Sequence, residues 1–150
     1  MESEVERCRT CSLVRVHLAG PFSGEALLEV LSEIEEVSAR AKGRTEVWDV
    51  RDVRDLYLKP AEATRLKRHR SEWEEDAEGR TAVMAQTSSQ RTYGTVLCQT
   101  LRPHARAHRP FFEAERAARW LGCPPPSGES EDKGMVADGA CGRRCLLRSI

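Results

Sequence analysis

Apolar residues along the chain alternate between short runs rich in β-branched side chains and stretches with helical spacing. The first run, residues 13–18, predicts a strand that the dipeptide Gly20-Pro21 ends. Val5, in the polar segment before it, predicts a short strand that pairs antiparallel with the first. Ser23 then predicts the N-cap of a helix whose apolar residues recur at three- and four-residue intervals, with Gly43 just past its end.

The same alternation of strand and helix recurs before residue 122. The predicted strands are 47–50, 81–86 and 111–112, and the predicted helices are 60–73, a segment capped by Ser88 or Ser89 and ended by Pro103, and 114–121. Such alternation predicts an α/β fold: a mostly parallel sheet of four or five strands, with helices packed against it through right-handed crossovers.

The composition changes after the last predicted helix. Residues 124–132 are rich in proline, serine and acidic residues, and their apolar content is too low to offset the entropy of ordering. We therefore expect one α/β domain over residues 1–122 and a disordered C-terminal tail over residues 123–150.

The charges balance, because 24 Lys and Arg residues face 24 Asp and Glu residues and the formal net charge is zero. A neutral chain lacks overall attraction to nucleic acid or to an anionic membrane, so we expect neither partner. No apolar run approaches the roughly 20 residues that span a bilayer, and the acidic start is unlike a signal peptide. These features predict a cytoplasmic protein without stable membrane insertion, whose six cysteines are reduced thiols.

Four segments of the chain carry a pattern found in a known family. They are Val14 to Phe22, Val47 to Asp52, Thr81 to Ala85, and Phe112 to Gly122. Their most specific pieces are Trp48-Asp49-x-Arg51 and Ala117-x-x-Trp120-Leu121. In this order the segments resemble the STAS-like, or SpoIIAA-like, proteins, which are related to bacterial anti-sigma-factor antagonists. The resemblance covers residues 5–122 and implies a compact sheet with helices packed on it, and a role in binding rather than in catalysis.

One departure from the family concerns its regulatory serine. Classical antagonists carry a phosphorylatable serine in an Asp-Ser-Ser/Thr-Gly turn after the central strand. The corresponding segment here, residues 52–60, has no hydroxyl except that of Tyr57, and Thr64 lies a turn inside the next predicted helix. The resemblance implies a binding module, and this departure from the family pattern argues against regulation by the family's serine phosphorylation switch.

Acidic residues follow the predicted central strand, at the sheet edge where open parallel sheets bind ligands. The candidate binding residues at this edge are Asp49, Arg51, Asp52, Asp55 and Leu58. Arg51 and Arg54 alternate with the carboxylates. Ion pairs and turn capping therefore explain why these residues are charged, without a metal site or a catalytic role. We prefer this interpretation to a Mg²⁺ site or an acid–base pair.

Two basic clusters are further candidates for an anion or an acidic partner. One lies within residues 65–70 of the second predicted helix, where the acidic residues between 72 and 78 offset it, and we interpret it as a solvated face. The other lies in a predicted loop over residues 102–109, where Arg106 and Arg109 are the candidate binding residues. The loop cluster is less balanced and is the better anion candidate.

Motifs for metal binding or catalysis are weak. Cys8-x-x-Cys11 precedes a strand, whereas a thioredoxin-type pair opens a helix. With Cys141 and Cys145 it offers four thiolates for Zn²⁺, but at an unusually long separation for a zinc module. No nucleophile elbow, phosphate-binding glycine loop or His-Glu-x-x-His motif is present in the sequence. We therefore expect no enzyme activity, no cofactor and no bound metal.

These observations favour a regulatory module that binds a protein partner near the end of the central strand and the helix beginning at Pro60. The alternative is a carrier for a small apolar or lipid-like ligand, which a pocket lined by Leu56, Leu58, Leu66 and Tyr93 would favour. A hydrolase that uses the Asp residues is a third class.

Overall fold

The computed structural model describes residues 2–8, 13–38, 45–73, 79–101 and 106–122. The elements in these ranges are β1 (Glu2–Arg7), β2 (Leu13–Ser23), α1 (Gly24–Ser38), β3 (Thr45–Tyr57), α2 (Pro60–Trp73), β4 (Gly79–Met84), α3 (Ser88–Leu101), β5 (Arg106–Phe111) and α4 (Ala114–Trp120). The predicted alternation of strands and helices is confirmed, and so is the antiparallel strand around Val5.

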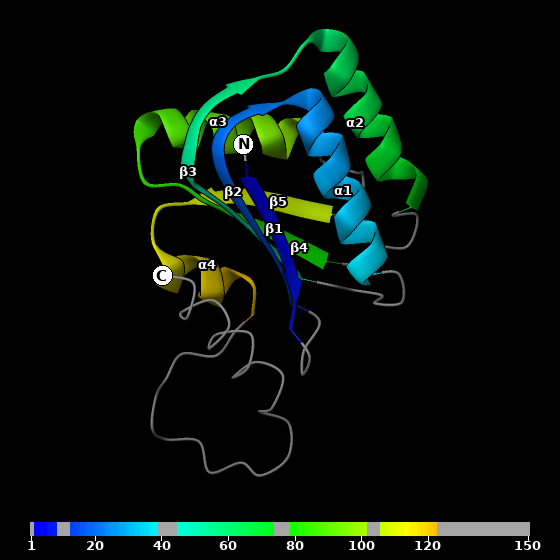
Figure 1. Ribbon diagram of the computed structural model, residues 1–150. Helices are drawn as coiled ribbons and strands as arrows, with labels where there is room; N and C mark the ends of the chain where they lie inside the picture. The colour runs from blue at the N-terminus through cyan, green and yellow to red at the C-terminus, as the bar shows by residue number, and fades with distance from the viewer. Residues whose placement is uncertain (1, 9–12, 39–44, 74–78, 102–105, 123–150) are drawn as a thin grey trace, which may run out of the picture.

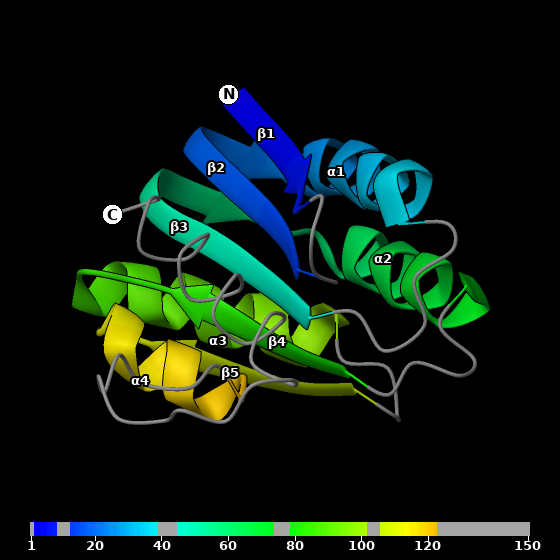
Figure 2. The same ribbon diagram turned by 90° about the horizontal axis from the view of Figure 1, so that it is seen from below.

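The strands form one sheet in the order β1-β2-β3-β4-β5, in which β1 is antiparallel to β2 and the other neighbours are parallel. Because this order advances steadily across the sheet, right-handed crossovers place α1, α2 and α3 on the same face. The last helix, α4, packs against β4 and β5 on the opposite face (Figure 1, Figure 2). The predicted α/β fold is confirmed, with one full helical layer and one partial layer.

Two apolar clusters lie on the two faces of this sheet. The larger lies under α1, α2 and α3 and includes Trp48, Leu27 and Leu97. The smaller lies under α4 and includes Val47 and Met84. Strands β2, β3 and β4 each contribute to both clusters, as expected for interior strands of a sheet that is covered on both faces.

The predicted end of β2 at Gly20-Pro21 is wrong. The strand continues to Ser23, because two irregularities in its pairing with β3 absorb both residues, and Gly20 adopts a φ of 87° that suits glycine. The longer β2 provides a partner for a longer β3, which runs to Tyr57. The carboxylates predicted to follow the central strand therefore lie within it.

The predicted helix cap at Ser88 or Ser89 is also wrong, because Thr87 caps α3. The Thr87 hydroxyl accepts a hydrogen bond from the Gln90 backbone N–H (3.2 Å), and the Gln90 side chain accepts one from the Thr87 N–H (3.1 Å). This reciprocal pair is a capping box one residue earlier than expected, with Gln in the third helical position.

Two predictions about basic residues need correction. The segment from Arg106 to Arg109 is not a loop, because its backbone pairs in parallel with β4 and forms the edge strand β5. Arg70 does not lie on a solvated face. It is 1% exposed, and its Nη2 lies 2.7 Å from Oε2 of Glu46, a fully buried residue of β3. A buried guanidinium needs such a partner to offset the loss of hydration.

Several predictions fall on residues outside the described ranges. They concern the tail from residue 123, the helix ends at Gly43 and Pro103, and the side chains of Arg102, His104, Cys11, Cys141 and Cys145.

Candidate functional site

Asp49 and Arg51 form a bidentate ion pair on the sheet face opposite α1. Asp49 Oδ1 accepts hydrogen bonds from the backbone N (3.1 Å) and from Nε (2.8 Å) of Arg51, and Oδ2 lies 2.5 Å from Nη2. The Asp49 side chain is only 7% exposed, and that of Arg51 is 21% exposed. The ion pair that the charge pattern predicted is therefore present, near the middle of β3.

The pKa values of this pair move apart. Burial by itself would raise the pKa of Asp49, but the hydrogen bonds from Arg51, followed by the charges of Arg51 and His17, outweigh burial and lower it. The hydrogen bond to Asp49 raises the pKa of Arg51, against the opposing effect of burial. Both groups are therefore charged at neutral pH.

His17 of β2 lies between two of the candidate carboxylates. Its Nδ1 is 3.8 Å from Oδ2 of Asp49, and its Nε2 is 3.3 Å from Oδ2 of Asp52. A three-residue spacing would place these carboxylates on opposite faces of a regular strand. The register with β2 shifts between His17 and Ala19, however, so that Asp52 pairs with Ala19 on the face of Asp49. Asp52 is 66% exposed and presents its charge to solvent.

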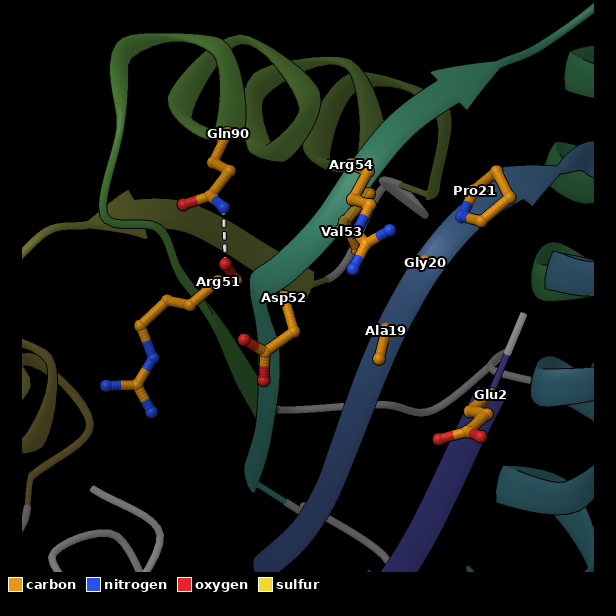
Figure 3. A pocket seen from close by; sticks show the side chains of 9 residues that line it. All are labelled: Glu2, Ala19, Gly20, Pro21, Arg51, Asp52, Val53, Arg54 and Gln90. Carbon is orange, nitrogen blue, oxygen red and sulfur yellow. Dashed lines mark hydrogen bonds between the residues drawn. The ribbon is translucent and has the colours of Figure 1, made fainter.

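A groove of about 590 Å³ opens where β2 and β3 extend beyond their neighbours; the pairing of β3 with β4 ends at Asp49. Figure 3 shows its lining, which comes from β1, β2, β3 and the start of α3. The lining residues are Glu2, Ala19, Gly20, Pro21, Arg51, Asp52, Val53, Arg54 and Gln90. The groove is therefore polar, with carboxylates and guanidinium groups side by side.

Helix α3 fixes the β3 wall of this groove. The Gln90 side-chain amide donates a hydrogen bond to the carbonyl oxygen of Arg51, shown as the dashed line in Figure 3. The Tyr93 hydroxyl donates another to the carbonyl oxygen of Arg54 (3.4 Å). These side chains satisfy backbone groups in the part of β3 that extends past β4, where a sheet edge would otherwise remain open.

The end of β3 presents an exposed aromatic ring. Tyr57 is 65% exposed, although it is the last residue of β3 and its backbone pairs with Ser23 of β2. At the start of α2, the Glu62 carboxylate accepts a hydrogen bond from the Lys59 backbone N–H (2.8 Å). Helix α1 comes so close that a Cβ atom on Gly24 would lie 2.4 Å from the Glu62 Cβ. Tyr57 therefore projects from a corner where the end of β3 and the starts of α1 and α2 are closely packed.

Arg109 lies apart from these residues, at the end of β5. A second pocket there, of about 480 Å³, is lined by Arg91, Arg109, Pro110, Phe111, Phe112, Glu113 and Arg116. The guanidinium carbon of Arg109 lies 5.5 Å from the centre of the Phe111 ring, and that of Arg91 lies 5.2 Å from the centre of the Phe112 ring. Both distances are typical of cation–π contacts.

The structure thus divides the predicted binding residues among three places. Arg51 and Asp52 line the groove, and Asp49 supports it through Arg51. Asp55 is exposed further along β3, and Leu58 is half-buried in the connection to α2. Arg109 lines the second pocket and Arg106 begins the same strand.

Sequence reasoning missed several residues that line or support these sites, among them His17, Gln90, Arg91 and Arg116. His17 had a local signal, because its alternation with apolar neighbours places it on the opposite face of β2. Gln90, Arg91 and Arg116 had none, since each meets its partners only through the packing of α3 and α4 beside the strand ends.

The apolar residues proposed to line a carrier pocket serve the core instead. Leu66 is fully buried in the larger cluster, and Leu56, Leu58 and Tyr93 pack against it. Among the described residues, no group of three or more His, Cys, Asp or Glu side chains is placed to hold a metal ion. In the same part of the chain, no helix is both long and apolar enough to cross a membrane.

Comparisons with known proteins give a match at the level of structure. No protein-family model and no curated protein matches the sequence. An uncharacterized protein from Shewanella loihica, of the DUF3478 family with a SpoIIAA-like fold, matches with a TM-score of 0.54 and 18% identity, over 80% of this chain and 92% of that one.

Two structures of SpoIIAA also match. The unphosphorylated anti-sigma factor antagonist does so with a TM-score of 0.49 and 15% identity, over 81% of this chain and 99% of that one. The phosphorylated Bacillus cell fate determinant does so with a TM-score of 0.47 and 18% identity, over 79% and 99%. Together with the strand order and the helical layers, the Shewanella structure shows that this chain has the SpoIIAA-like fold that its sequence resembled.

Proposed function

We propose that this chain is a non-enzymatic regulatory module that binds a protein partner at the end of β3 and the start of α2. The observation that carries the proposal is the exposed ring of Tyr57 at the end of β3, beside the closely packed starts of α1 and α2. Tyrosine is among the residues that dominate binding energy at protein interfaces, because a large ring is buried at little entropic cost. A solvent-exposed tyrosine on a fixed strand end is suited to that role.

The polar groove next to this corner supports a protein partner rather than an apolar ligand. Asp52 and Arg54 are exposed on its walls and carry opposite charges. Charges of both signs, fixed in position, select the orientation of a partner with the complementary pattern. An apolar carrier would need a lined cavity, whereas the leucines near this corner pack against the core.

We further propose that the module works without a serine switch. The connection between β3 and α2 consists of Leu58 and Lys59 and carries no serine or threonine. The first hydroxyl inside α2 is that of Thr64. It donates a hydrogen bond to the carbonyl oxygen of Pro60 (3.1 Å), a backbone acceptor of the same helix. Regulation would then lie in the partner or in competition for the surface.

The test is native mass spectrometry of the chain purified under gentle conditions from its own cells. Wild type and Tyr57→Phe should retain a stoichiometric polypeptide, and Tyr57→Ala should lose it, since removing such an anchor weakens binding about 30-fold. Glu33→Gln, on the exposed side of α1, is the matched surface control and should retain the partner. Equal retention by Tyr57→Ala and Glu33→Gln would exclude this surface, and a co-purified small molecule without a polypeptide would favour the carrier.

A further inference from the structure

Three arginines from three different elements converge on the pocket at the end of β5. Arg91 comes from α3, Arg109 from β5 and Arg116 from α4. The chain as a whole has no net charge, so a pocket lined by three cations and one carboxylate is a local concentration of positive charge. Such a concentration raises the local density of anions.

Aromatic rings hold two of these guanidinium groups in place. Arg91 lies over Phe112 and Arg109 over Phe111, and Phe111 in turn packs at a tilt against Trp120, with ring centres 5.4 Å apart. A guanidinium group over a ring keeps its N–H edges available for a carboxylate or phosphate. Because the groups are already oriented, less entropy is lost when an anion binds.

The charges of Arg91 and Arg109 are not neutralised within the part of the chain that the structure describes, where no ion pair engages either residue. The one carboxylate that lines the pocket, Glu113, pairs with Arg116 (Nε to Oε2, 3.3 Å). Two oriented cations therefore face the pocket without an acidic neighbour of their own.

We propose that this arginine pocket binds an acidic peptide segment of a protein partner, at a site separate from the Tyr57 surface. Its walls are exposed side chains, including Phe112 at 47% exposure, and a small molecule would remain largely solvated between them. Pro110 lacks a backbone donor, which disfavours the addition of another strand at the β5 edge. Recognition therefore rests on side chains, with carboxylates on the arginines and an apolar residue on Phe112.

The test uses the full chain and a fluorescein-labelled decapeptide in which Glu alternates with Ser, followed by fluorescence anisotropy in about 20 mM salt, where screening is weak. Arg91→Gln and Arg109→Gln should each weaken binding about tenfold, the effect of losing one charge-assisted hydrogen-bonded contact. Phe112→Ala keeps every charge but removes the ring under Arg91, and should weaken binding about threefold. Arg119→Gln is the matched control, since it removes an exposed arginine of α4 outside the pocket, and should change binding less than twofold.

A charge reversal makes the test specific. The variant Arg91→Glu/Arg109→Glu should bind the matching Lys-Ser decapeptide and lose the Glu-Ser peptide. The proposal is overturned if Arg109→Gln and Arg119→Gln behave alike, or if the reversal does not exchange the two peptides. It is also overturned if a labelled dT10 oligonucleotide binds more tightly than the acidic peptide and depends on the same arginines, because the site would then recognise nucleic acid. Tyr57→Ala should leave peptide binding unchanged, so this result and the test of the Tyr57 surface fail independently.

Discussion

Replacing Glu46 by glutamine should destabilise the protein strongly, because Glu46 and Arg70 form a buried ion pair. Their side chains are 0% and 1% exposed, and Oε2 of Glu46 lies 2.7 Å from Nη2 of Arg70. The same oxygen accepts hydrogen bonds from the Trp48 indole N–H (3.0 Å) and the Thr81 hydroxyl (3.4 Å). The substitution preserves shape and an acceptor oxygen but removes the carboxylate charge of Glu46 from the buried guanidinium group of Arg70.

The expected loss follows from that burial. Removing one partner of a buried pair costs about 3–5 kcal/mol, because the remaining charge has lost both water and its neighbour. A domain of this size has an unfolding free energy of about 5–15 kcal/mol. With a urea dependence of about 2 kcal/mol per molar, a loss of about 4 kcal/mol lowers the unfolding midpoint by about 2 M.

Urea unfolding followed by circular dichroism measures this change, and a second variant isolates its cause. Glu46→Gln/Arg70→Met removes both charges while the glutamine can still accept a bond from Trp48, so the double variant should recover most of the lost stability. A midpoint that falls by less than about 0.5 M would refute the reasoning. So would a double variant no more stable than the single one, since packing rather than charge would then explain the loss.

Two further predictions concern the groove and the helix that supports it. Asp49→Asn should lower the unfolding free energy by about 1–3 kcal/mol at pH 7. Because Arg51 lowers the folded-state pKa of Asp49, that stability is present above the unfolded value of about 3.9 and is lost as pH falls through the folded value. Urea midpoints of wild type and variant should therefore converge as the pH falls below the folded-state pKa of Asp49, and a gap that stays constant would contradict the ion pair. Thr87→Ala should cost about 1 kcal/mol in urea unfolding through loss of the cap that it shares with Gln90, whereas Ser89→Ala should cost little; equal losses would argue against the capping box.

The order of strands and helices could be predicted because buried positions recur along the sequence with the spacing typical of a helix or a strand. Ala82, Val83 and Met84 form an uninterrupted apolar run in β4 because both faces of that strand are covered. Strand ends carried a weaker signal. Gly20-Pro21 has the composition of a turn, yet β2 continues through it, because pairing with β3 and a local bulge outweigh the local preference.

The candidate sites were predictable where charge pairing is local. Arg51 lies two residues from Asp49, so their contact follows from alternation along one strand. Arg70 illustrates the opposite case. Arg70 lies in the same basic segment as Arg68, which is exposed. Only the contact of Arg70 with Glu46, 24 residues earlier in the chain, distinguishes it as a core residue. The charge pattern of a helix does not say which of its arginines faces a buried carboxylate on another element.

The polar groove beside the Tyr57 surface and the arginine pocket are linked by the first turn of α3. Gln90 donates to the carbonyl oxygen of Arg51 and so holds the groove wall, while the next residue, Arg91, lines the arginine pocket. Consecutive helical residues point about 100° apart, so one turn serves two separate surfaces. The capping box between Thr87 and Gln90 stabilises that turn and so supports both the groove and the pocket. A partner that occupied both would bind more tightly than one that occupied either alone, because its second contact forms within the same complex.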